Sequence, residues 1–222
     1  MSRVPQPAGE RGSLKWIQRA VNQRSDVLET AVRRALPLPA GRFLECVSPL
    51  QKDDYAEYRD QTALERLRLG PLKHPLPNFW PTRGPQSDAL ATCGDAVLLV
   101  EAKAHVRELL SPSTQASKPS RRRIQASLQL AQRGFRASPG CDWSLRFYQY
   151  ANRLAHLHFL WKMNRVNALL AFVYFLNDTE MNGPATEREW QAAISVLQEA
   201  IGVRGRLPES RIADVFVDVR QL

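Results

Sequence analysis

The feature that most constrains the fold of this chain is a nearly continuous apolar stretch at residues 168–176. It is too short to cross a bilayer, which takes about 20 residues. Its length and its apolar character on both sides are typical of a strand that is covered on two faces of a sheet. Helical patterns precede and follow it. The sequence therefore predicts an α/β fold with a mixed central sheet flanked by helices.

A second apolar run, residues 96–100, belongs to a predicted β-hairpin. Gly94 and Asp95 supply a tight turn between strands expected over 86–93 and 95–103. The chain between this hairpin and the later apolar strand is long enough for a helical crossover. We therefore expect these two strands to be parallel and joined by a right-handed connection.

Hydrophobic spacing and turn residues place the other elements. Thr186 and Glu189 form a capping-box pattern at the start of one helix. Helices are expected over 13–36, 53–69, 121–134, 143–164 and 186–201, with a short strand over 42–48 and a final strand over 213–219. The chain then divides into a flexible tail over 1–12, an N-terminal helical extension over 13–52 and an α/β domain over 53–222.

The charge balance indicates an anionic partner. Lysine and arginine exceed the acidic residues by enough to give a formal charge of +9, which favours nucleic acid. The three cysteines are widely spaced and form no CxxC pair, so we expect neither a zinc site nor a disulfide framework, and a cytoplasmic location. No secretory signal or membrane span is predicted, so a membrane partner is not expected. The sequence does not distinguish a monomer from a homodimer.

Three residues of the predicted hairpin are the first candidates for a metal-binding catalytic site. Glu101 and Lys103 are two apart on a strand and so share a face. Asp88 precedes them on the partner strand, which can return it to the same face. Two carboxylates are hard oxygen ligands that suit Mg²⁺ or Mn²⁺. The alternative, without a catalytic role, is that Glu101 and Lys103 form a cross-strand ion pair at a solvated sheet edge.

This pattern resembles the PD-(D/E)xK nuclease superfamily, over roughly residues 53–180. The match consists of Pro85-x-x-Asp88 followed by Glu101-Ala102-Lys103, although Pro85 does not directly precede Asp88. The resemblance implies a restriction-endonuclease-like core. It also implies that Asp88, Glu101 and the Ala102 carbonyl bind Mg²⁺ or Mn²⁺, and that Lys103 orients the attacking water or stabilises the transition state.

Other acidic residues are weaker candidates for the metal. Asp95 competes with Asp88, but the predicted turn leaves it at the hairpin tip. Some members of the superfamily add an acidic residue from the leading helix, for which Glu45, Glu57 and Glu65 are candidates. For each of these three we favour a solvated charge.

One face of the predicted helix 143–164 is polar among apolar neighbours. Gln149, Asn152, Arg153 and His156 gather there at helical spacing. Such groups need partners when buried. A substrate phosphate or metal-bound water would serve, and so would an internal hydrogen-bond network. Some superfamily members carry Gln-x-x-x-Tyr on this helix, and here Gln149 matches while Arg153 stands in place of the tyrosine. We expect Gln149 to support the catalytic site.

Basic residues are the candidates for nucleic-acid contact. Positive charge at a helix N-terminus is unfavourable, and phosphate would relieve it. The alternative is an exposed basic loop. The candidates are Arg121, Arg122, Arg123 and Arg153.

Together these patterns predict a metal-dependent phosphodiester hydrolase, with DNA favoured over RNA as its substrate. Two other classes remain open. One is a catalytically inactive nucleic-acid-binding module on the same fold, since a fold does not fix an activity. The other is a protein-interaction module, which would show no salt-dependent affinity for DNA.

Overall fold

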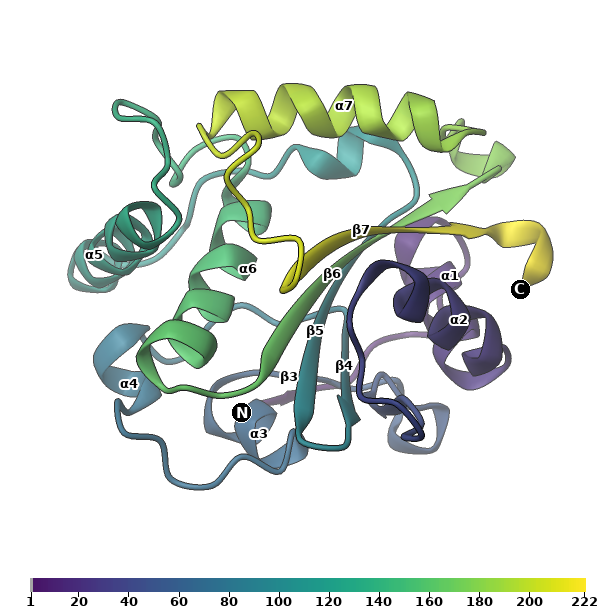
Figure 1. Ribbon diagram of the computed structural model, residues 1–222, viewed down its shortest axis with the longest axis horizontal. Helices are drawn as coiled ribbons and strands as arrows, with labels where there is room; N and C mark the ends of the chain where they lie inside the picture. Colours follow the sequence, from purple (N-terminus) through teal and green to yellow (C-terminus); the bar gives the residue numbers. More distant parts are fainter. Residues whose placement is uncertain (1) are drawn as a thin grey trace.

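The computed structural model describes residues 2–222 and has a five-stranded mixed sheet flanked by helices (Figure 1). The strand order in this sheet is β2-β4-β5-β6-β7, and β1 pairs with β3 in a separate two-stranded sheet. The strands are β1 (Arg3–Val4), β2 (Glu45–Ser48), β3 (Glu57–Tyr58), β4 (Ala89–Cys93), β5 (Ala96–Lys103), β6 (Ala168–Leu176) and β7 (Ile212–Asp218). The predicted fold class is confirmed.

Seven α-helices surround the two sheets within the described residues. They are α1 (Gly12–Asn22), α2 (Ser25–Ala35), α3 (Asp60–Arg66), α4 (Leu76–Phe79), α5 (Lys118–Gly134), α6 (Tyr148–His158) and α7 (Glu187–Ala200). A π-helical turn, Phe159–Met163, continues α6. Short 3-10 turns occupy Gln51–Asp53, Val106–Leu109, Thr179–Met181 and Val219–Gln221.

Strand directions match the sequence prediction. β4 is antiparallel to both β2 and β5, with Ala89 opposite Val100, so the hairpin is confirmed. β5, β6 and β7 are parallel, with Glu101 opposite Phe172. The long connection from β5 to β6 runs through α5 and α6 and returns the chain beside β5 (Figure 1). β5 therefore lies at the centre of the sheet.

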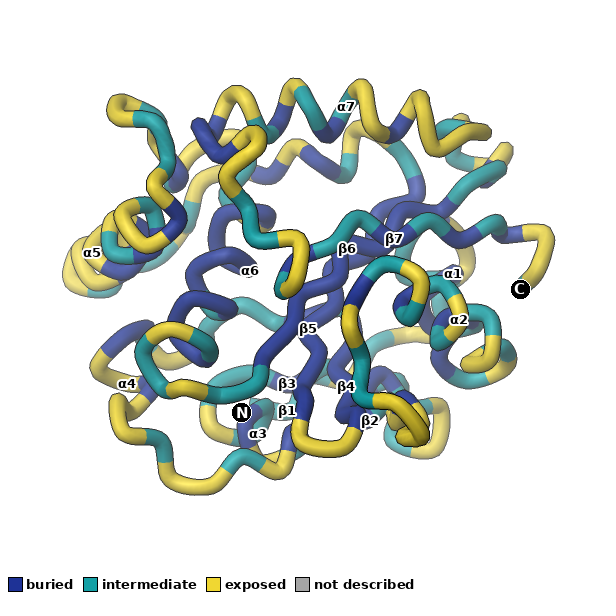
Figure 2. The backbone as a smooth tube through the Cα atoms, in the orientation of Figure 1, coloured by how far each residue is buried: buried dark blue, intermediate teal, exposed yellow. Residues whose placement is uncertain are grey.

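Alternate residues of β5 enter two different layers of the core. Leu98, Val100 and Ala102 belong to the cluster that includes α1 and α2, whereas Val97 and Leu99 belong to the cluster that includes α6. In Figure 1 α1 and α2 lie on one side of the sheet and α6 on the other. Figure 2 shows the strands between them as an almost continuous buried layer. The period of two along a strand accounts for this division.

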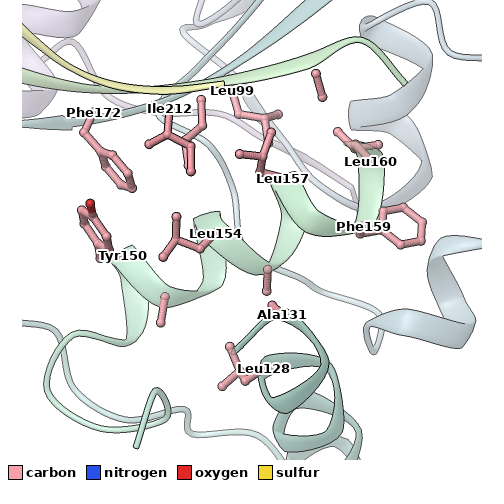
Figure 3. Close-up of a cluster of buried hydrophobic side chains, with 14 of the residues drawn as sticks. Leu99, Leu128, Ala131, Tyr150, Leu154, Leu157, Phe159, Leu160, Phe172 and Ile212 are labelled. Atoms are coloured by element: carbon pink, nitrogen blue, oxygen red, sulfur yellow. The ribbon is translucent and has the colours of Figure 1, made fainter. Parts of the chain in front are cut away.

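Helix α6 is fixed against the sheet by its apolar face (Figure 3). The ring of Tyr150 stacks on Phe172 of β6, with centroids 3.9 Å apart. Leu154 and Leu157 are fully buried in the same cluster. This packing determines which residues of α6 can reach the end of β5.

The N-terminal region differs from the prediction in two ways. A single helix over 13–36 is wrong, because the chain breaks between α1 and α2. The break lets α1 pack against β5 and α2 against β7, which one straight helix would not do. The segment 13–52, predicted as an N-terminal extension, packs into the rest of the chain, since its helices form one layer of the core and β2 is part of the five-stranded sheet.

Three further boundaries need correction. Residues 3–4 of the expected flexible tail form β1, which pairs with β3. The predicted helix over 53–69 contains β3 and the shorter α3. The predicted helix over 143–164 begins only at Tyr148, after a loop. No helix within residues 2–222 combines the length and the apolar character needed to span a bilayer.

Candidate functional site

Asp88 lies immediately before β4 and is held beside β5 by the hairpin ladder. Its backbone N–H donates to the Val100 carbonyl at 3.0 Å. Its side-chain Oδ2 accepts from the Ala102 N–H at 2.7 Å. The antiparallel register thus brings Asp88 next to the Glu101-Ala102-Lys103 segment, as the sequence predicted.

Glu101 is the centre of a buried charge cluster. Lys103 Nζ donates to Glu101 Oε1, and Arg153 Nε donates to Glu101 Oε2 at 2.6 Å. Lys103 Nζ also lies 3.3 Å from Gln149 Oε1. The Glu101 side chain is only 1% exposed. Each of its two oxygens accepts a hydrogen bond from a protein cation. The structure therefore brings together Asp88, Glu101, Lys103 and Gln149, and adds Arg153.

This arrangement keeps the cluster charged. Burial opposes the charge on Glu101, but Arg153 and then Lys103 outweigh it and hold the pKa of that carboxyl below its ordinary value. Burial likewise opposes the charge on Lys103, and the negative charges of Glu101 and Asp88 raise its pKa. Opposite charges within a few ångströms have this effect when water is excluded. Lys103 is therefore a cation at neutral pH.

A third carboxylate, Glu57, lies beside this cluster on β3. Its Oε2 accepts hydrogen bonds from the amides of Gln6 and Gln86, each at 3.2 Å. Burial and the nearby charge of Asp88 raise the pKa of Glu57 to about 8. Burial and the charge of Glu101 raise the pKa of Asp88 to about 6. The carboxyl groups of Glu57, Asp88 and Glu101 therefore lie close enough for the charge of one to raise the pKa of another.

Sequence reasoning named Glu57 but favoured a solvated charge for it, and that expectation is wrong. It failed because the segment was predicted to be a helix, whereas β1 pairs with it and places it against the hairpin. The signal in the sequence was weak, since β3 is only two residues long.

Asp88 and Glu57 line an open cleft with a volume of 930 Å³. Its lining includes residues of α6, of the loop before β4 and of the segment before α5, and we call the last two segments its walls. The lining residues are Glu57, Arg59, Trp80–Gln86, Asp88, Ser111–Ser117, Ser120, Ile124, Tyr148, Gln149, Asn152 and Arg153. The buried charge cluster is thus connected to solvent through Asp88, Gln149 and Arg153.

Other predicted site residues lie elsewhere or are engaged differently. Arg121, Arg122 and Arg123 are exposed on the first turns of α5 and are not among the residues lining the cleft. Arg153 is buried and ion-paired, so it is not a free cation for nucleic acid. Ala102 presents its backbone N–H to Asp88, while its side chain enters the opposite core layer.

Two interpretations without a catalytic role were also drawn from the sequence: an ion pair between Glu101 and Lys103 at a solvated edge, and an internal hydrogen-bond network on the polar helix face. Glu101 and Lys103 do form an ion pair, but β5 is a central strand and the pair is buried, so a solvated edge is wrong. The polar face of α6 does contain an internal network. Arg153 donates to Asn152 Oδ1 at 2.7 Å and also to the carbonyl of Gln86. His156 instead packs against Trp80, with ring centroids 4.7 Å apart.

The remaining acids lie outside the cluster. Glu45 pairs with exposed Arg68 at 2.8 Å, and Glu65 is exposed on α3. Asp95 lies at the hairpin tip, where its Oδ2 accepts from the Asn167 amide at 3.1 Å. These positions agree with the solvated roles expected for them.

The donor set suits a hard divalent cation in its chemistry, because the candidate ligands are the carboxylate oxygens of Asp88 and Glu101 and the carbonyl oxygen of Ala102. Asp88 lines the open cleft, whereas Glu101 would have to exchange a protein cation for the metal. Across residues 2–222 no group of three or more His, Cys, Asp or Glu side chains is arranged to hold a metal ion.

Comparison of the chain with protein-family models, with curated proteins and with solved structures gives no match. The residues of the site are therefore the basis on which a function can be assigned.

Proposed function

We propose that this protein is a Mg²⁺- or Mn²⁺-dependent nuclease that acts on DNA in preference to RNA. The observation that carries the proposal is the position of Asp88. It lies at a solvent-connected cleft, directly beside a buried Glu101 that is paired with Lys103. Two carboxylates can hold a divalent metal, and a lysine beside them can stabilise negative charge that develops on a phosphate, and both serve metal-assisted phosphodiester hydrolysis.

The proposal gives each residue a role. Asp88 and Glu101 would hold the metal, which when bound polarises the phosphate and lowers the pKa of a coordinated water. Lys103 stays protonated and offers positive charge to a developing phosphoryl oxyanion. Gln149 accepts from Lys103 and limits where its ammonium can move. Glu57, with its pKa raised to about 8, is mostly protonated at neutral pH, and a cation bound at this place would favour its ionised form.

A second candidate is a nucleic-acid-binding module without catalytic activity, and one observation favours it. Arg153 and Lys103 occupy both oxygens of Glu101. In this arrangement the arginine supplies the positive charge that a metal would otherwise supply. For either function we propose a cytoplasmic setting, which is compatible with the free thiols of Cys46, Cys93 and Cys141.

Metal binding and cleavage together test the nuclease. The purified protein should cut plasmid or single-stranded DNA with Mn²⁺ and not with EDTA. Mn²⁺ should also raise its melting temperature, because a ligand that binds only the folded state stabilises it. Asp88→Ala should abolish both effects.

Asp95→Asn is the matched control, since Asp95 is a carboxylate of the same hairpin that lies at its tip. This variant should keep the cleavage and the Mn²⁺ shift. DNA binding without cleavage or metal stabilisation would replace the nuclease with the inactive binding module. Cleavage that survives in Asp88→Ala would exclude the proposed site.

A further inference from the structure

Hydrogen bonds anchor one end of each wall of the cleft. The wall formed by the loop before β4 is held by Asp60, whose two oxygens accept from the N–H groups of Arg83 at 3.0 Å and Gly84 at 2.9 Å. The wall before α5 is held by Ser111. Its N–H donates to the Arg146 carbonyl at 2.7 Å, and its Oγ accepts from the Gln149 N–H at 2.9 Å.

The size of the cleft favours an unpaired base over a duplex. Its volume of 930 Å³ lies within the range of about 300–1,000 Å³ that is typical of pockets for small ligands. A base of a single strand can enter a pocket of this kind directly. A base of a duplex must first leave its stack and its pair, which costs free energy.

The lining also has the chemistry of a single-strand site. Tyr148 lines the cleft and is half-buried, because part of its ring packs against the core. Aromatic rings fixed in this way serve as platforms for unpaired bases. Most other groups in the wall before α5 are uncharged hydroxyls and amides, and the exposed or half-buried cations of the lining, Arg59 and Arg83, come from other segments. This is a sparse set of charges for a duplex backbone.

We propose that the cleft takes a single-stranded segment of nucleic acid, such as a free strand or an overhang, and that Tyr148 stacks on one of its bases. The inference rests on the proposed function, since it assigns the substrate class of the same site. It predicts that a strand enters between the two walls and brings one phosphate to Asp88.

Fluorescence anisotropy with labelled DNA tests the inference. The probes are a single-stranded 12-mer, a blunt duplex of the same sequence and that duplex with a single-stranded overhang, all in buffer with Ca²⁺ in place of Mg²⁺. The single strand and the overhang should bind at least about tenfold more tightly than the blunt duplex. Tyr148→Ala should weaken single-strand binding by about fivefold or more, because one stacked base contributes about 1–3 kcal/mol. Tyr148→Phe should keep the affinity.

Phe43→Ala is the matched control. Phe43 is an exposed aromatic residue next to β2 and is not among the residues lining the cleft. This variant should bind like the parent, and the melting temperature of each variant establishes that it is folded. Equal affinity for the blunt duplex, or unchanged binding by folded Tyr148→Ala, would overturn the single-strand inference and leave the proposed nuclease standing. No binding of any probe would overturn both.

Discussion

Glu101 shows how much the site depends on single side chains. Its carboxylate balances two buried cations, Lys103 and Arg153, so its removal leaves charge without compensation. Breaking a buried ion pair by removing one partner costs about 3–5 kcal/mol. We therefore expect Glu101→Gln to lower the free energy of unfolding by an amount in this range, as measured by urea denaturation.

The exposed pair between Glu45 and Arg68 is the comparison for this experiment. Glu45→Gln should cost no more than about 1 kcal/mol, since solvent screens surface pairs. Glu101→Gln combined with Arg153→Gln should cost less than the sum of the two single changes, because the double variant removes a charge together with its partner. A Glu101→Gln variant as stable as Glu45→Gln would contradict the buried cluster.

His156 should make the stability of the folded protein depend on pH. Its Nδ1 lies 2.8 Å from the Asn152 carbonyl and its ring packs on Trp80. Burial lowers the pKa of His156 to about 4, the neighbouring charge of Arg153 acts in the same direction, and Asp60 opposes it. The unfolded chain, with a histidine pKa near about 6.5, therefore takes up this proton first as the pH falls. Stability conferred by His156 is present above about pH 6.5 and is lost towards pH 4.

His156→Gln should flatten this part of the stability curve, as measured by urea midpoints at pH steps between 4 and 7. His74→Gln, which changes an exposed histidine, should leave the curve of the parent protein unchanged. Identical curves for His156→Gln and the parent would mean that His156 is not buried in its neutral form.

At the scale of elements, α7 depends on its first turn. Glu189 N–H donates to Thr186 Oγ1 at 3.3 Å, and Thr186 N–H donates to Glu189 Oε2 at 3.0 Å. Loss of an N-cap side chain costs about 0.5–2 kcal/mol. Thr186→Ala should therefore destabilise the protein by about 1 kcal/mol in thermal or urea unfolding. Thr30→Ala, at an exposed helix-interior position, should cost less, and the reverse order would contradict the capping box.

The elements that sequence predicted well are those with a strong local signal. The capping box, the hairpin turn at Gly94 and the apolar strand β6 each carry their own pattern within a few residues. The same holds for the site residues on the hairpin, because strand register alone brings Asp88 beside Glu101. Helical periodicity also predicted that Gln149 and Arg153 share a face of α6.

The parts of the fold and of the site that the sequence did not predict depend on long-range contacts, which local sequence patterns do not encode. The break between α1 and α2 follows from the need to cover β5 and β7 together. Glu57 joins the site because β1, over fifty residues earlier in the chain, pairs with β3. Arg153 pairs with Glu101 across 52 positions. Its spacing on the helix predicted its face but gave no information about its partner.

At the scale of the whole molecule, the excess positive charge lies largely outside the cleft. The formal charge is +9, yet the cleft is lined by the arginines Arg59, Arg83 and Arg153 together with the acids Glu57 and Asp88. By contrast, the exposed cations Arg121, Arg122 and Arg123 lie on the first turns of α5, which directly follow the segment that forms one wall of the cleft. We therefore expect these cations to attract nucleic acid to the surface, and the cleft to select the strand.

This division of roles predicts a change in salt dependence. Each phosphate contact on a single strand contributes about −0.7 to the slope of log affinity against log salt. Replacing Arg121, Arg122 and Arg123 together by serine should therefore make the slope shallower by up to about 2. The same change should weaken binding of all DNA probes at low salt and keep the preference for single strands. Anisotropy titrations across a salt series measure both quantities.

The control replaces three exposed cations on other elements, Lys52, Arg188 and Arg204, by serine. Both triple variants lose the same formal charge, so a difference between them reports position and not net charge. The control should keep most of the slope of the parent protein. If both variants lose it equally, the attraction comes from the overall charge of the molecule, and the N-terminal turns of α5 have no special part in binding.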